Sequence, residues 1–332
     1  MAISIDDIKK LRAMTGAGLA DVKKALTEAE GDFDKAKELL RERGLAIAAK
    51  RSDRETSNGC VLVKCVDGFA AIIALKCETD FVANGADFIA LTQSILDAAI
   101  AAKAKDVEAV KELTLANGQK VQDAVTQRSG ITGEKMELDG YLTLEGENIE
   151  VYNHMGKNTL CTMVQTNKPA AEQGHLVAMQ VAAMKPVALD AQSIDPKILD
   201  EEYKTAVEKT KLEQVEKYVE VVLKKAGINP NLVDSEDHIE SNMAKGWLTQ
   251  EQADEARKLK EQAAAEKAGS LNMNMIENIA KGRVQKFLKE NCLVDQEFQF
   301  GDGDKATVAQ WLARQDKELK IVDFKRFTLV AD

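Results

Sequence analysis

Residues 60–77 constrain the fold of this chain more than any other stretch of its sequence. Two apolar runs, CVLVKCV and FAAIIALKC, are separated there by Asp67-Gly68. An Asp-Gly pair favours the tight two-residue turn that joins neighbouring antiparallel strands, because both residues tolerate positive φ angles. The sequence therefore predicts an antiparallel β-hairpin at residues 60–77.

The second apolar run ends at the tripeptide ETD, and Phe81 follows where the chain turns toward a helix. By position alone, Phe81 is a core aromatic that begins a helix, and Asp80 is a local helix cap. Beyond this turn, apolar residues recur at helical spacing in GADFIALTQSILDAAIAAKAK, and a further helix is expected over residues 106–127. The spacing of apolar residues does not explain why a large aromatic residue stands beside a carboxylate at this boundary between a strand and a helix.

Helical periodicity and changes in composition divide the chain into a helical start, a polar linker, a mixed core and a helical insertion. Three short helices are expected at the start, of which the third begins after Gly31-Asp32 and ends at Gly44. In the insertion, the break GINPN interrupts two long helical patterns, which is typical of a projecting helical hairpin or coiled coil. The expected fold class is α+β. The expected parts are 1–50 (three-helix domain), 51–59 (linker), 60–139 (first part of the core), 140–195 with 270–332 (second part of the core) and 196–269 (inserted hairpin).

The composition argues against several classes of protein. A chain of 332 residues with 45% hydrophobic residues can form globular cores, and its 5% of aromatic residues favours helices over an aromatic-rich sandwich. The net charge of −10 argues against a dedicated nucleic-acid binder, which carries a basic surface. No apolar run approaches ~18 residues, the start MAISIDDIKK does not resemble a signal peptide, and the five cysteines form no C-x-x-C pair. We therefore expect a cytoplasmic protein with reduced thiols that binds neither nucleic acid nor membrane directly.

Motifs for catalysis and metal binding are missing from the sequence. Its three histidines are too few and too dispersed for a typical zinc or hydrolase site. Neither a G-x-x-x-x-G-K-[ST] phosphate loop nor a G-x-G-x-x-G segment after a strand is present. No nucleophile stands at motif spacing from a plausible base. We therefore expect no catalytic residues, no cofactor and no metal, and an enzyme is the least favoured class of function.

Two stretches resemble the signatures of a known family. The first stretch comprises Leu11-Arg12, TGAGL at residues 15–19, Asp21, Lys23-Lys24 and Ala25-Leu26. The second is CETDFVA at residues 77–83, in the expected strand-to-helix turn. Together with YNH, AMQVAAMKP and GRVQKF downstream, they resemble elongation factor Ts, the family of bacterial nucleotide exchange factors for elongation factor Tu. The resemblance covers nearly the whole chain except the 210–270 region.

The resemblance implies a fold and a mechanism. The fold is an amino-terminal three-helix module like a ubiquitin-associated (UBA) domain, a two-part core of antiparallel sheets packed with helices, and a coiled-coil protrusion inserted in the second part. The implied function is to promote GDP release from elongation factor Tu, by binding the nucleotide-free partner better than the GDP-bound one. Phe81 would wedge between side chains of the partner's nucleotide domain, with Asp80 close by, and disturb its Mg²⁺ site. Thr79 and Val82 complete this contact segment.

The resemblance also assigns contacts outside this segment. Arg12 and Leu19 would touch a helix of the same partner domain, although by pattern alone Arg12 is solvated and Leu19 is a core residue. Gly133, in TGEK, and Gln180, in AMQVAAMKP, correspond to weaker contacts. Many members of the family have His where this chain has Gln180, and Gln keeps a neutral donor and acceptor but cannot become cationic.

A second class of function stays open, that of a non-catalytic scaffold or adaptor that binds through the three-helix bundle and the hairpin. Long charged helices often mediate self-association, so the hairpin, or the second part of the core, also offers a surface for a homodimer. The two functions differ at Phe81, because an adaptor does not need an aromatic residue at the end of that strand.

Overall fold

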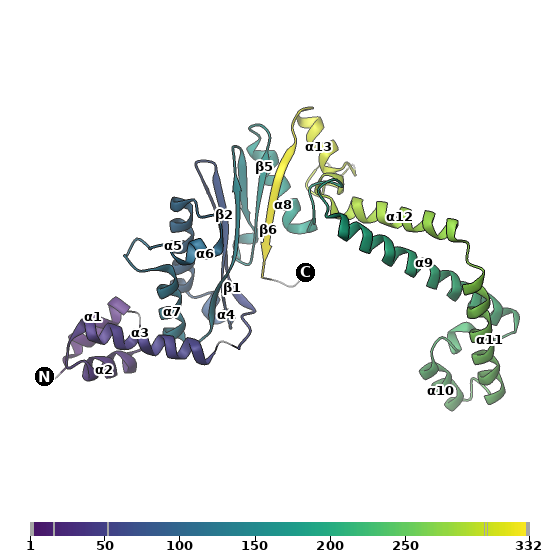
Figure 1. Cartoon of the computed structure of the whole chain (residues 1–332), viewed down its shortest axis with the longest axis horizontal. Coiled ribbons are helices and arrows are strands. Elements are labelled where there is room, and N and C mark those ends of the chain that lie inside the picture. The colour runs from purple at the N-terminus through teal and green to yellow at the C-terminus, as the bar shows by residue number, and fades with distance from the viewer. Residues whose placement is uncertain (1–2, 16, 52, 302, 304, 330–332) are drawn as a thin grey trace. The chain divides into compact units, whose positions relative to one another are not determined.

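The computed structural model (Figure 1) describes residues 3–15, 17–51, 53–301, 303 and 305–329. Two compact units make up the chain: a core unit, up to Leu189 and again from Gln296, and a helical unit, Asp190–Asp295. The core unit combines helices with two three-stranded antiparallel sheets, so the predicted α+β class is confirmed. Gly16 of the TGAGL motif lies outside the described residues. No helix among the residues that the structure describes is long and apolar enough to cross a lipid bilayer.

Three helices at the amino terminus pack around a small apolar core of their own. They are α1 (Ile5–Thr15), α2 (Leu19–Glu28) and α3 (Phe33–Lys50). Leu11, Val22 and Leu26 are fully buried among them. Because short helices are marginal in water on their own, burial of these side chains is what stabilises the bundle. Its likeness to a UBA domain stays a prediction.

The third helix does not end at Gly44, as the sequence predicted, but continues to Lys50. Gly44 is buried where α3 crosses α7 (Val121–Thr132), and it lies against Gly130 of that helix. A Cβ atom on Gly130 would lie 2.3 Å from the Cα atom of Gly44, closer than two carbon atoms can approach without a bond. The prediction was wrong because Gly44 allows two helices to pack closely, and a glycine in that role looks the same in sequence as one that ends a helix.

The first sheet contains the predicted hairpin. Its strands are β1 (Asn58–Val66), β2 (Phe69–Cys77) and β3 (Met136–Glu145), paired antiparallel in that order. Asp67 and Gly68 have φ angles of 48° and 73°, as the tight turn requires, so the hairpin prediction is confirmed. β3 crosses the boundary expected between residues 139 and 140, because its pairing with β2 keeps the whole strand in the first sheet.

The second sheet faces the first across a shared apolar layer. Its strands are β4 (Ile149–Asn153), β5 (Leu160–Thr166) and β6 (Ile321–Thr328), again antiparallel. Side chains of β1, β2 and β5 meet between the sheets, among them the fully buried Val61, Ile72 and Met163. Because helices cover the outer face of the first sheet as well, β2 is buried at nearly every position.

Helices form the outer layers around the two sheets (Figure 1). α5 (Ala86–Ala102) covers the first sheet, with Phe88 fully buried, and α8 (Ala171–Met184) covers the second. The shorter helical elements of the core unit are α4 (Asp80–Ala83), α6 (Val107–Lys111), α13 (Val308–Gln315) and a 3₁₀ turn, η1 (His154–Gly156). The single helix expected over residues 106–127 was wrong, because the chain leaves helical geometry between α6 and α7.

The helical unit is built on one long helix that packs against two others. Its elements are α9 (Pro196–Lys225), η2 (Pro230–Leu232), α10 (Glu236–Ala244), α11 (Gln250–Gly269), α12 (Met273–Asn291) and η3 (Leu293–Asp295). α9 packs against both α11 and α12, and Arg283 of α12 forms an ion pair with Glu213 of α9. The expected insertion ended at residue 269, whereas this packing adds α12 and extends the unit to Asp295.

Candidate functional site

Phe81 lies in a short exposed segment between the end of β2 and α5, and we call residues 79–82 the Phe81 tip. Thr79 is extended, with φ −120° and ψ 155°, and its Oγ1 atom accepts a hydrogen bond from the backbone N–H of Val82. Phe81 is 87% exposed, whereas Val82 packs against the core. The interpretation of Phe81 as a core aromatic is therefore wrong, and its ring is available to be buried by another molecule.

Asn84 closes the other end of the tip. Its Nδ2 atom donates to the backbone carbonyl of Asp80 at 2.8 Å, and its backbone N–H donates to the same oxygen at 2.9 Å. Asp80 itself is exposed on the first turn of α4, and the residue that caps this helix is Thr79. The cap role that position alone suggested for Asp80 thus belongs to its neighbour, and the exposed Asp80 carboxylate stands next to Phe81.

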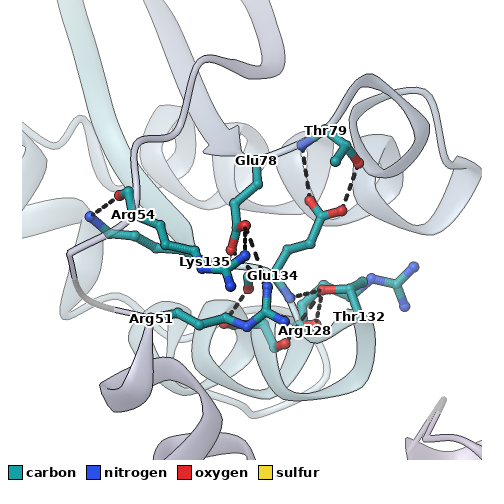
Figure 2. Close-up of polar contacts among 9 residues, drawn as sticks. Arg51, Arg54, Glu78, Thr79, Arg128, Thr132, Glu134 and Lys135 are labelled. Atoms are coloured by element: carbon teal, nitrogen blue, oxygen red, sulfur yellow. Dashed lines mark hydrogen bonds and ion pairs between the residues drawn. The ribbon is translucent and has the colours of Figure 1, made fainter.

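A carboxylate from a distant part of the sequence holds Thr79 (Figure 2). The backbone N–H of Thr79 donates to Oε2 of Glu134 at 3.1 Å, and the Thr79 hydroxyl donates to Oε1 at 2.6 Å. Glu134 follows Gly133, which ends α7 in the left-handed conformation with a φ of 70°. Gly133 thus has a conformational role beside the tip, because this turn directs Glu134 toward Thr79.

A second carboxylate, Glu78, ties the tip to the segment that follows the three-helix bundle (Figure 2). Its side chain is 13% exposed and forms ion pairs with Arg51 at 3.1 Å and with Arg54 at 2.9 Å. The backbone N–H of Lys135 donates to Glu78 at 2.6 Å. This hydrogen bond, followed by the two guanidinium groups, lowers the pKa of Glu78 to about 2. Arg51 and Arg54, expected in a linker, are thereby fixed to the sheet.

We expect Glu78 to make the stability of the core unit depend on pH in acid solution. The folded-state pKa of Glu78, about 2, lies below its ordinary value of 4.5. The ionised side chain therefore stabilises the fold in full above pH 4.5, and this stabilisation is lost as the pH falls toward 2. Glu78→Gln should lower the free energy of unfolding by about 1.5 kcal/mol near pH 7. Below about pH 4.5 this difference should shrink by at most about 1.4 kcal/mol per pH unit. Urea unfolding of both proteins over this range measures it, and a difference that stays constant would contradict the expectation.

The two residues assigned to the amino-terminal module belong to a separate surface. Arg12 is exposed on α1, and Leu19, 58% exposed, begins α2. Leu19 is therefore not the core residue that its pattern suggested. The bundle contacts the rest of the core unit through α3 and α7, and α7 leads directly to Gly133 and Glu134. The structure thus brings Gly133 together with the tip at residues 79–82, whereas Arg12 and Leu19 lie on α1 and α2.

Gln180 does not reach the surface, although the sequence suggested a contact there. It is 0% exposed on α8, and its Nε2 atom donates to the backbone carbonyl of Glu297 at 3.1 Å. Nε2 also lies 3.3 Å from Oε1 of Gln296, and the Gln180 Oε1 atom accepts from the backbone N–H of Gln299 at 3.0 Å. These bonds satisfy the buried amide and join α8 to the segment that follows the helical unit. Gln180 therefore has an internal role in this structure and presents no surface to a partner.

The chemistry of the site is that of binding. Within the described parts of the chain, no group of three or more His, Cys, Asp or Glu side chains could hold a metal ion. Burial raises the pKa of Cys77, next to the tip, to about 12, and that of Cys60 to about 11. Thiols with such pKa values stay protonated and unreactive near neutral pH. The tip therefore offers an exposed aromatic ring and a carboxylate on a fixed backbone.

Sequence reasoning missed Glu134 and the arginines around Glu78. Glu134 lies 55 positions after Thr79, and no periodicity or motif spacing connects residues at that separation. The one local signal was Gly133, since a glycine after a helical run is typical of a left-handed helix end, which turns the following residue in a new direction.

Known proteins resemble this chain over its full length. A family model described as "Elongation factor TS" matches residues 78–331. Proteins named "Elongation factor Ts" from Bacteroides fragilis and Phocaeicola vulgatus are 60% and 59% identical, over 100% of both chains in each case. A protein of the same name from Porphyromonas gingivalis is 42% identical, also over 100% of both chains. The family match includes the Phe81 tip, and the relatives extend the similarity to the three-helix bundle.

Proposed function

The chain belongs to the elongation factor Ts family, and on this premise we propose that it is a guanine nucleotide exchange factor for elongation factor Tu. It acts in the elongation stage of protein synthesis, in the cytoplasm where that partner works. It promotes release of GDP without covalent chemistry. The observation that carries the proposal is the exposed Phe81 on a tip whose two ends are fixed by hydrogen bonds.

Nucleotide exchange requires a difference in affinity between two states of the partner. A GTP-binding protein holds its nucleotide through a phosphate loop and a Mg²⁺ ion, whose charge offsets that of the phosphates. The exchange factor must bind the nucleotide-free state more tightly than the loaded state, because only differential affinity shifts an equilibrium. In our proposal the Phe81 ring enters the partner's nucleotide domain, with Asp80 adjacent, and disturbs the Mg²⁺ site. By reciprocity, rebinding of nucleotide weakens the factor's hold, so one molecule of the factor acts repeatedly.

The three-helix bundle supplies a second contact in this proposal. Arg12 and Leu19 dock on a helix of the same partner domain, and their exposure in the free protein is consistent with that role. Gly133 contributes through the turn that places Glu134 against the tip, whereas the buried Gln180 takes no direct part.

Release of a fluorescent GDP analogue from elongation factor Tu tests the proposal. The labelled complex is mixed with excess unlabelled GDP, with and without catalytic amounts of the intact protein, and the fluorescence is followed in time. Acceleration of release by the intact protein is the expected result. Binding to the partner without acceleration would instead favour the scaffold or adaptor function, in which the bundle and the helical unit serve as docking surfaces. If the intact protein neither binds the partner nor accelerates release, the proposal is overturned.

A further inference from the structure

We infer that Glu134 is a positioning residue for nucleotide exchange: its carboxylate fixes the direction in which Phe81 is presented to the partner. The inference rests on the proposed exchange function, and Glu134 acts through Thr79 rather than by touching the partner's nucleotide. We call Glu134 and its two hydrogen bonds to Thr79 the brace. Three observations support the inference: the geometry of these bonds, the shortness of α4 and the fixation of Glu134 itself.

Both oxygen atoms of the Glu134 carboxylate bond to the same residue. Oε2 accepts the backbone N–H of Thr79 at 3.1 Å, and Oε1 accepts its hydroxyl at 2.6 Å. Since one donor is on the backbone and the other on the side chain, the pair fixes the peptide plane and the rotamer of Thr79 together. The hydroxyl gives its proton to Glu134 and so presents a lone pair to the N–H of Val82, at 3.4 Å. Glu134 therefore sets the cap that begins α4.

α4 is too short to orient Phe81 without such support. It spans Asp80–Ala83, and a single helical turn is unstable in water because its nucleation fixes several dihedral angles for one hydrogen bond. The Phe81 ring adds little packing, because the residue is 87% exposed. Beside the packing of Val82 and Ala83 against the core, the tip is held at its ends, where Glu134 bonds to Thr79 and Asn84 bonds to the carbonyl of Asp80.

Glu134 is itself held by the turn that follows α7. Its backbone N–H donates to Oγ1 of Thr132 at 3.3 Å, and its carbonyl oxygen accepts the hydroxyl of Ser129. The next residue, Lys135, donates its N–H to Glu78 at 2.6 Å. Figure 2 shows how these bonds fasten the turn on both sides of Glu134. The carboxylate thus extends from a fixed backbone, which a side chain that positions another residue requires.

An ordered tip reduces the entropy lost when the partner binds. Association is more favourable when a binding segment already has its bound conformation. Without the brace, Phe81 samples directions that do not enter the partner's nucleotide domain, and GDP release slows. Because this effect passes through Phe81, it should vanish when the Phe81 ring is absent.

A double-mutant cycle between Glu134 and Phe81 tests the inference. Rates of GDP release from elongation factor Tu are compared for the intact protein, Glu134→Ala, Phe81→Ala and the double variant. We expect Glu134→Ala to slow release about tenfold when Phe81 is present, because two charge-assisted hydrogen bonds are lost. When Phe81 is already alanine, the further slowing should be less than about twofold. Equal factors in the two backgrounds, or no slowing by Glu134→Ala, would overturn the inference.

Two other variants separate positioning from a loss of folding. Asp139→Ala on β3 removes an exposed carboxylate that pairs with Lys76 at 2.6 Å, and it should leave the release rate unchanged. Glu134→Gln keeps the length of the side chain and one oxygen that can accept the Thr79 N–H, but it places an NH₂ group where the second accepting oxygen was, so its release rate should lie between those of Glu134→Ala and the intact protein. A Glu134→Gln variant as fast as the intact protein would show that accepting both donors of Thr79 is not what positions the tip.

Amide hydrogen exchange at Thr79 distinguishes failure of the brace from failure of the proposed function. In the free protein, the Thr79 N–H should exchange faster in Glu134→Ala than in the intact protein, and Asp139→Ala should leave it unchanged. Unchanged exchange at Thr79 in Glu134→Ala would overturn the brace whatever the release rates are. An intact protein that does not accelerate GDP release would overturn the exchange function, while the Thr79 amide would still decide whether the brace exists.

Discussion

Phe81→Ala is expected to slow the catalysed release of GDP from elongation factor Tu by about 30-fold, the factor that corresponds to a binding hot spot of about 2 kcal/mol. The ring is 87% exposed in the free protein, and in the proposed mechanism it is buried when the complex forms. The substitution removes little packing from the free protein, so its free energy of unfolding should change by less than about 0.5 kcal/mol. Loss of exchange activity at unchanged stability is the behaviour of a side chain that acts at an interface.

Val66→Ala is a suitable control for Phe81→Ala. Val66 is 39% exposed on the same hairpin, and it pairs with Phe69 at the turn, at the opposite end from Cys77 and the Phe81 tip. Stopped-flow measurements of the labelled GDP analogue should show normal release with Val66→Ala and slow release with Phe81→Ala. Fast release with Phe81→Ala would leave the exchange function in place but remove the wedge from its mechanism.

Gly130→Ala should destabilise the core unit by about 3 kcal/mol, the upper end of the range for overpacked sites. Its methyl carbon would lie 2.3 Å from the Cα atom of Gly44, so the obstacle is backbone, which no change of rotamer relieves. α3 and α7 must move apart, and the three-helix bundle loses its close contact with α7. The destabilisation is expected even though alanine favours a helix by roughly 0.5–1 kcal/mol over glycine. Urea unfolding measures the loss of stability, and hydrogen exchange in α3 and α7 measures the loosening of their contact.

Gly282→Ala provides the comparison for Gly130→Ala. Gly282 lies inside α12, where a Cβ atom would meet no atom within 4 Å. The same change should therefore stabilise the protein there, by roughly 0.5–1 kcal/mol. If Gly130→Ala were stabilising to the same extent, the close crossing of α3 and α7 would be contradicted.

The sequence predicted the features that neighbouring residues determine. Asp67-Gly68 between two apolar runs predicted the first hairpin correctly, because turn geometry and strand propensity act over a few residues. The signature at residues 77–83 directed attention to Phe81, and the exposure of its ring is consistent with an interface. Its contact with a partner stays a prediction.

The sequence could not predict features that depend on the approach of distant segments. Gly44 resembled a helix end, and the presence of Gly130 on a crossing helix is what makes it a packing residue instead. The resemblance implies a partner contact for Gln180, whereas the groups to which it hydrogen-bonds in the structure lie 116 or more positions away and enclose it. The brace joins Thr79 to Glu134 across 55 positions. In each case the deciding interaction is tertiary, and a single sequence does not record which segments meet.

The pairing of β5 with β6 has a consequence for how this protein is made on the ribosome. Thr166 ends β5 and Ile321 begins its partner strand, so the entire helical unit is synthesised between the two strands. At about 5–20 residues per second, the ~150 residues between them take roughly 8–30 s to appear. During that interval β5 has β4 on one side and an open edge on the other, and open edges recruit strands from other chains. During this interval the nascent chain therefore carries an incomplete second sheet, and this is the stage at which binding by chaperones would protect it most.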